Sequence, residues 1–172
     1  YLALERLKID PNKPQNLVET KKRNVKNRLT AYAIPNTTYD RFWSKLDESY
    51  FIRHEESEIV WHTRVINYQG SDDQALVRAR LSPIGDGLQV LTYGKNEPLV
   101  FARICRFFED TEFSVVEAKV FTTKDNCYLN TFQVLIDRYA ENDYQDMINH
   151  IEHALPMALS SSSLPKSNNG RI

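Results

Sequence analysis

Apolar residues recur at helical spacing through the first third of the chain. Val18, Val25 and Leu29 are separated by seven and four positions, with lysines and arginines between them. This pattern is typical of an amphipathic helix and predicts one over about 15–33. Pro35 ends it, because proline cannot continue the helical hydrogen-bond ladder.

Two further helices are predicted after this proline. The first carries an apolar stripe at positions i, i+3, i+4, i+7 and i+11, and residues 36–38 can cap its start. That stripe consists of Tyr39, Phe42, Trp43, Leu46 and Tyr50. Ser57 can cap the next helix, which carries Ile59 and His62. Residues 1–67 are therefore predicted to form a helical block.

From residue 75 the apolar period changes to the two-residue alternation of β-strands. Residues 75–82 alternate in this way, and the proline and glycines of 83–87 supply a turn into a second strand over 88–93. A helix is predicted after Pro98, because proline is tolerated in a first helical turn. Two more strands follow, joined by a tight turn at Asp125–Asn126, since both residues tolerate positive φ.

The second half of the chain thus predicts an α+β domain. Its inward strand positions are expected to be Val116, Ala118, Val120, Phe132, Val134 and Ile136, and its outward ones Glu117, Lys119, Thr131 and Gln133. A last helix carries an apolar stripe over 144–155. From residue 88 the order is strand, helix, strand, strand, helix, the plan of a ferredoxin-like domain with two helices on one face of an antiparallel sheet. The plan's final strand is missing, and we expect strand 75–82 to take its place.

Composition points to a cytoplasmic protein with a packed core. Hydrophobic residues make up 41% and charged residues 26% of the 172 positions. No apolar run approaches the roughly 20 residues that span a bilayer, and the first ten residues do not resemble a signal peptide. The chain begins without Met, so we expect it to be a piece of a longer protein. Cys105 and Cys127 are expected to be buried hydrophobes in a reducing cytosol.

Charge is unevenly distributed along the chain. Residues 1–34 carry a net charge of +5, which leaves −6 for the remainder. A basic segment can contact nucleic acid or an acidic partner, but a solvated helix face is the simpler interpretation.

Several segments resemble the family of protein-PII uridylyltransferase/uridylyl-removing enzymes. Residues 98–109, 114–126 and 129–135 look like the first ACT domain of that family, a ferredoxin-like regulatory module. Upstream, Tyr50-Phe-Ile-Arg-His54 and Ile59-Val-Trp-His62 are similar to the stretch between its HD phosphohydrolase domain and that ACT domain. The resemblance predicts a division into a helical segment over 1–67, an ACT-like domain over 70–159 and a serine-rich tail over 160–172.

This resemblance implies a regulatory role in nitrogen signalling. The enzymes attach UMP to PII protein and remove it again in response to glutamine. Their nucleotidyltransferase and HD domains hold the catalytic site and Mg²⁺, so the chain is expected to have enzyme activity only through its parent and no cofactor of its own. Glutamine, PII and a second ACT domain or second copy are the implied partners, without nucleic acid or membrane.

The turn from the second strand into the following helix is the candidate ligand site. Its residues are Tyr93, Gly94, Lys95, Asn96, Glu97, Pro98, Leu99 and Val100. Free N–H groups at a helix start attract a carboxylate, such as that of an amino acid. ACT domains that bind amino acids tend to have Asp and Gly where this chain has Asn96 and Leu99. Losing the glycine is expected to hinder close backbone approach, which leaves a scaffold without ligand as an alternative.

No catalytic constellation is evident in the sequence. The segment 70–73 resembles the Gly-Ser opening of a nucleotidyltransferase site but is not followed by the paired aspartates that hold Mg²⁺. His150 and His153 could share a helix face, yet are better explained as surface residues. His54 and His62 are expected to be partly buried, bonded, and packed against Trp61 or Tyr50.

Two other functions remain open from the sequence. RNA-recognition modules share the ferredoxin-like plan, but strand 127–136 lacks their aromatic signature and the −6 charge repels phosphates. A protein-interaction module without a small-molecule ligand is the other possibility. Self-association is predicted in either case, because the sheet leaves an exposed edge.

Overall fold

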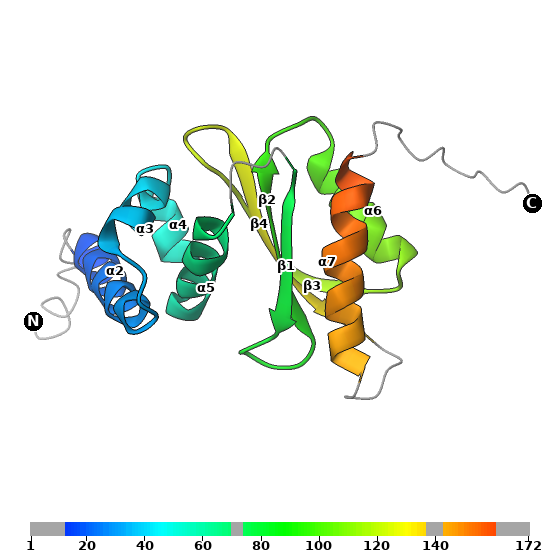
Figure 1. The fold of residues 1–172 in the computed structure, drawn as a ribbon, viewed down its shortest axis with the longest axis horizontal. Helices are drawn as coiled ribbons and strands as arrows, with labels where there is room; N and C mark the ends of the chain where they lie inside the picture. Colours follow the sequence, from blue (N-terminus) through cyan, green and yellow to red (C-terminus); the bar gives the residue numbers. More distant parts are fainter. Residues whose placement is uncertain (1–12, 70–73, 137–142, 161–172) are drawn as a thin grey trace, which may run out of the picture. The chain divides into compact units, whose positions relative to one another are not determined.

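The structure is a computed structural model that describes residues 13–69, 74–136 and 143–160. It divides into two compact units, Tyr1–Asp72 with Phe121–Cys127, and Asp73–Val120 with Tyr128–Ile172. The first unit is mainly helical, and the second contains a β-sheet (Figure 1). The predicted loop at 70–73 and the predicted tail beyond Ser160 lie outside the described residues.

Helices make up the described part of the first unit before residue 70. They are α2 (Lys13–Ala31), α3 (Asn36–Trp43), α4 (Glu48–Arg53) and α5 (Glu56–Asn67). The prediction of one helix through Tyr39 and Tyr50 is wrong, because the helix is interrupted between α3 and α4. Asp47 is the N-cap of α4, and its carboxylate accepts a bond from the Tyr50 N–H at 3.3 Å. This local cap competes with helix continuation, although the predicted apolar stripe is buried throughout.

The caps proposed for α3 and α5 also differ from prediction. Pro35 is the N-cap of α3 and makes no side-chain bond, so none of residues 36–38 serves as the cap. At α5 the cap is Glu55, whose N–H donates to the Glu58 carboxylate at 2.8 Å in a capping box, while Ser57 lies inside the helix.

Basic residues of α2 take part in packing this unit. The Lys21 ammonium donates to the carbonyls of Phe51 and His54, both at 2.9 Å. Those carbonyls end α4, where helix carbonyls lack partners and a cation is favourable. The Lys26 ammonium lies 5.6 Å from the centre of the Trp43 ring. Part of the basic charge is thus used within the unit, and Arg23 is among the residues that remain exposed.

The segment Phe121–Cys127 clusters with these helices in the first unit. The Phe121 and Tyr50 rings meet edge to face with centroids 5.4 Å apart. Lys45 and Asp125 form an ion pair of 2.8 Å. Burial alone would raise the pKa of Asp125, but hydrogen bonds from Lys45 and Thr123 and the charge of Lys45 lower it. As predicted, the turn is tight, with Asn126 at φ 59.

The second unit is built on a four-stranded sheet. Its elements are β1 (Leu76–Leu81), β2 (Leu88–Lys95), α6 (Val100–Asp110), β3 (Ser114–Thr122), β4 (Cys127–Leu135) and α7 (Tyr144–Ser160). The sheet order is β1-β2-β4-β3, with β1 antiparallel to β2. Strand β1 therefore occupies the place of the missing ferredoxin-like strand, as predicted.

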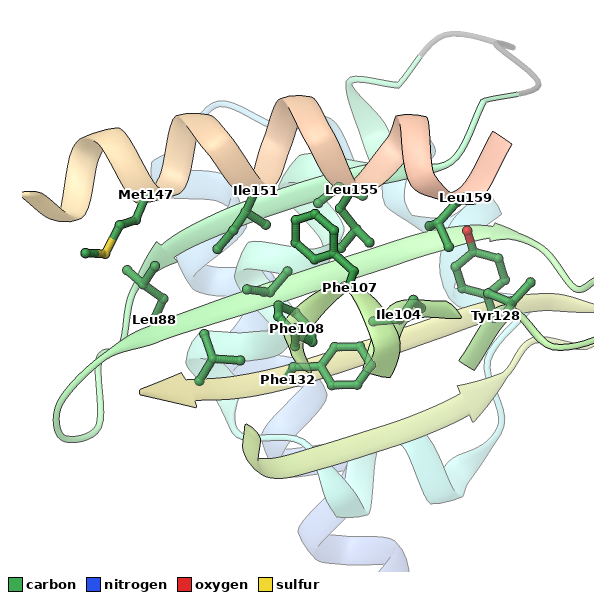
Figure 2. Close-up of a cluster of buried hydrophobic side chains, with 14 residues drawn as sticks. Leu88, Ile104, Phe107, Phe108, Tyr128, Phe132, Met147, Ile151, Leu155 and Leu159 are labelled. Carbon is green, nitrogen blue, oxygen red and sulfur yellow. The ribbon is translucent and has the colours of Figure 1, made fainter. Parts of the chain in front are cut away.

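The main core of this unit lies between the sheet and its two helices. Figure 2 shows α7 above the strands, with Met147, Ile151, Leu155 and Leu159 directed toward them. Residues from α6, β1, β2 and β4 complete the cluster, including Ile104, Phe108, Val77, Leu88, Val90, Phe132 and Val134. The predicted arrangement of two helices on one sheet face is confirmed, and with it the α+β class.

Strand β3 is more exposed than its pattern predicts. Val116 is 58% and Val120 43% exposed, so the expectation that they face a covered core is wrong. Because β3 is an edge strand, it has a neighbouring strand on one side only. Thr131 of the central strand β4 was expected to face solvent and is buried instead. Cys105 and Cys127 are half-buried, and burial raises the pKa of the Cys105 thiol.

Candidate functional site

The predicted ligand loop connects β2 to α6. Tyr93 and Gly94 are half-buried in the last part of β2, and the residues from Lys95 to Leu99 are exposed. Val100 begins α6 and is 7% exposed, as part of the core. The structure thus brings the candidate residues together at one end of the sheet, with an exposed turn and a buried base.

Leu99 has a backbone conformation that glycine adopts readily and other residues adopt rarely. It is the N-cap of α6, with φ 68 and ψ 10, in the left-handed region. A non-glycine residue in that region is strained by about 1 kcal/mol. The side chain is 53% exposed, so it recovers little of this by burial. The expectation that a side chain at this position hinders close approach to the backbone stays a prediction, because Leu99 carries a Cβ here.

The start of α6 presents the N–H groups expected of an anion site. The N–H of Val100 donates to the backbone carbonyl of Glu97 at 3.4 Å, and the N–H of Arg103 donates to the backbone carbonyl of Leu99 at 2.9 Å. The N–H groups between them belong to the first helical turn, where intrahelical acceptors are lacking. Lys95 and Glu97 place one charge of each sign in the exposed turn. This arrangement suits a zwitterion.

Gly94 has no side chain, which allows the Tyr128 ring to lie close to the end of β2. A Cβ added to Gly94 would lie 2.7 Å from the Tyr128 hydroxyl oxygen. Tyr128 is 6% exposed and belongs to the core cluster. In Figure 2 it stands near Leu159, at the opposite end of the core from Leu88. Tyr128 is thus a buried neighbour of the loop that its strand pattern did not predict.

Two further buried residues near this end have polar atoms without partners. Thr92 is 0% and Asn130 2% exposed. Within the described ranges, Thr92 Oγ1 and Asn130 Oδ1 form no hydrogen bond. Neither residue was predicted as part of the site, although each occupies an inward position of its strand by alternation. A polar residue in an inward register was the available signal.

The histidines lie elsewhere, and two of them belong to the core of the helical unit. His54 and His62 are 1% and 0% exposed, more deeply buried than predicted. One hydrogen bond of 2.7 Å joins the Tyr50 hydroxyl to His62 Nδ1, and the Trp61 ring lies 5.7 Å from that of His62. The prediction that they are bonded and packed against these aromatics is confirmed.

His150 and His153 are exposed on α7, as predicted. The part of the chain that the structure describes contains no group of three or more potential metal-ligating side chains. Nor does any helix in that part have the length and apolar character needed to cross a membrane.

The helical unit contains a groove. Its volume is about 410 Å³, and it lies along α2, α3 and α4. The Lys22 ammonium lies 4.7 Å from the centre of the Phe51 ring on its wall and 3.5 Å from the Glu19 carboxylate. A cation of the chain itself thus covers the aromatic wall, and we assign the groove no function.

Comparison with known proteins gives one consistent result. The family model described as "Uridylyltransferase GlnD fifth domain" matches residues 13–65. A bifunctional uridylyltransferase/uridylyl-removing enzyme of Chromobacterium violaceum is 44% identical over 144 residues, which are 84% of this chain and 17% of that protein.

Two further relatives carry the same name. The one from Thiobacillus denitrificans is 34% identical over 80% of this chain and 16% of its own length. The one from Burkholderia orbicola is 38% identical over 84% of this chain and 17% of its own length. The chain thus spans about a sixth of these proteins, and each match covers 80% or more of the chain.

Proposed function

The chain belongs, as one segment, to the family of bifunctional uridylyltransferase/uridylyl-removing enzymes, and from this premise we propose that it is the glutamine-sensing regulatory segment of such an enzyme. The enzyme activity, its PII substrate, its Mg²⁺ and its cytoplasmic location belong in this proposal to the longer parent protein. The chain's own part is to bind L-glutamine at the loop between β2 and α6.

The observation that carries this proposal is the backbone of that loop. Leu99 keeps the left-handed conformation of a glycine, and α6 begins directly after it. An amino-acid carboxylate placed there is stabilised by the N–H groups of the first turn. The carboxylate of Glu97 is then available to the ligand's ammonium, in place of the aspartate that Asn96 replaces.

Calorimetric titration of the chain with L-glutamine tests this function. We expect saturable binding, and tighter binding by a Leu99→Gly variant, because glycine keeps the left-handed backbone and removes the Cβ that obstructs approach. Leu99→Ala is the matched control, since it retains a Cβ at positive φ and should not gain affinity. Absence of glutamine binding by both wild type and Leu99→Gly would support the alternative, an interaction module without a small-molecule ligand.

We further propose that the domain pairs with a second copy or a second ACT-like domain through β3. The other edge strand is partly blocked, because the Ala79 N–H of β1 donates to the Glu152 carboxylate of α7 at 3.0 Å. Strand β3 instead exposes Val116 and Val120 along its length. An edge strand with apolar side chains is a template for pairing.

Sedimentation measures this association directly. At a protein concentration of tens of micromolar we expect a dimer, because dissociation constants in the micromolar range are ordinary for such contacts. Val116→Lys should produce a monomer, because it places a charge at the pairing edge. Leu81→Lys is the matched control: Leu81 is 57% exposed on β1, and its replacement should leave the dimer intact. A monomeric wild type would refute the pairing.

A further inference from the structure

Charged side chains of the sheet unit bind the outer edge of strand β1. The Ala79 N–H donates to the Glu152 carboxylate of α7 at 3.0 Å. The Val77 carbonyl accepts a hydrogen bond of 2.8 Å from Nη1 of Arg78. Strand β1 is the first in the sheet order and pairs with β2, so within the described sheet its other side is an edge.

The two bonded backbone groups point to the same side of the strand. In an antiparallel pair, alternate residues direct their N–H and C=O groups toward the neighbouring strand, and the residues between them direct theirs away. The Ala79 N–H is directed to α7, away from β2. Val77 lies two positions earlier, so its carbonyl also faces the outer edge of β1.

The carboxylate and the guanidinium take the places of groups that a further strand would supply. A strand that adds to an edge accepts from its N–H groups and donates to its carbonyls. Here Glu152 provides the acceptor for Ala79, and Arg78 provides the donor for Val77. Bonds to charged groups are stronger than bonds between neutral groups. An incoming strand would therefore have to displace two strong contacts.

The packing of α7 holds Glu152 at this edge. Its neighbours in the helix, Ile151 and Leu155, are buried and belong to the core cluster. Helix α7 packs against β1 (Figure 1). The half-buried Glu152 is thus positioned by the same contacts that build the core of the unit.

The two edges of the sheet therefore differ in what they offer a second copy. Strand β3 exposes the apolar side chains Val116 and Val120. A sheet with one available edge forms a closed pair, because a two-fold symmetric contact uses that edge in both copies. A sheet with two available edges can add copies at both and grow into an open-ended assembly.

We propose that Glu152 and Arg78 form an edge guard, which closes β1 to a second copy of the chain and limits association to one pair through β3. The limit to a pair rests on the proposed pairing through β3. The closure of β1 is measurable without it.

Sedimentation at tens of micromolar tests the edge guard with the double variant Arg78→Ala/Glu152→Ala. We expect assemblies larger than a pair, with a mass that rises with protein concentration, because both edges are then available. In combination with Val116→Lys, which should remove the β3 contact, the double variant should still form a pair through β1. Val116→Lys alone should be monomeric.

The matched control is Arg80→Ala/Asp146→Ala. It removes the same two charges from the same strand and the same helix. The Arg80 guanidinium donates to the Gln89 side chain at 2.7 and 3.0 Å, and Asp146 is exposed in the first turn of α7. This control should sediment like wild type in both backgrounds.

Amide hydrogen exchange tests the edge guard in wild type as well. The Ala79 amide should exchange about tenfold more slowly than the Leu81 amide, which points to the same edge by alternation. Glu152→Gln should keep this protection, because the carboxamide oxygen still accepts a hydrogen bond. Glu152→Ala should lose it.

The possible results separate the edge guard from the β3 pairing. A double variant that sediments like its parent in both backgrounds overturns the guard and leaves the pairing through β3 standing, whether or not its thermal midpoint falls. A monomeric wild type whose double variant forms pairs overturns the β3 pairing and leaves the guard standing. Where the double variant does not fold, the exchange measurement decides, and equal rates at Ala79 and Leu81 in wild type overturn the guard.

Discussion

Replacing Gly87 with alanine is expected to lower the free energy of unfolding of the sheet unit by about 3–5 kcal/mol. Gly87 has φ +90, which an L side chain rarely adopts, and its added Cβ would lie 2.1 Å from the Val134 carbonyl oxygen. That oxygen belongs to the backbone of β4, so the overlap can be relieved only by moving the backbone of β4 or of the turn that leads into β2. Urea denaturation followed by far-UV circular dichroism measures the loss.

Gly85 provides a matched control in the same turn. Its φ is +86, but a Cβ added there has nothing within 4 Å. Gly85→Ala should therefore cost only the backbone strain, about 1 kcal/mol. Equal losses for the two variants would show that φ, rather than close strand approach, dictates glycine at position 87.

The order of elements was predictable because it follows local pattern and turn length. The place of β1 followed from the short turn over 83–87, which forces it beside β2. The break between α3 and α4 was not predictable in this way, because the apolar stripe continues across it. The break is marked by the extended backbone of Asp47 and by the bond that its carboxylate accepts from the Tyr50 N–H, neither of which the apolar spacing reveals.

The burial of β3 and the detail of the site depend on tertiary structure. Val116 has the alternation of a core residue, and its exposure arises from the edge position of its strand. The loop was located from its proline and the following helix, but the conformation of Leu99 could not be read from a leucine. Thr92 and Asn130 become informative only once their partners are seen to be missing.

The helical unit offers the second large effect. His62→Leu is expected to destabilise it by about 2 kcal/mol, because the buried Tyr50 hydroxyl loses a bond of 2.7 Å. Burial, together with the charge of Glu58, raises the pKa of Tyr50 well above its usual value. The hydroxyl therefore stays protonated and needs a hydrogen-bond partner. Tyr50→Phe should cause a similar loss, since it removes the other partner.

A double-mutant cycle separates this bond from general packing. If the hydrogen bond is the main term, Tyr50→Phe combined with His62→Leu should cost about 1 kcal/mol less than the sum of the single changes, because neither polar atom is then left alone. Trp43 and Trp61, the chain's two tryptophans, both belong to this unit, so tryptophan fluorescence in urea follows its unfolding. If the losses of the two single variants simply add in the double variant, the hydrogen bond contributes little. The destabilisation by His62→Leu would then come from lost packing.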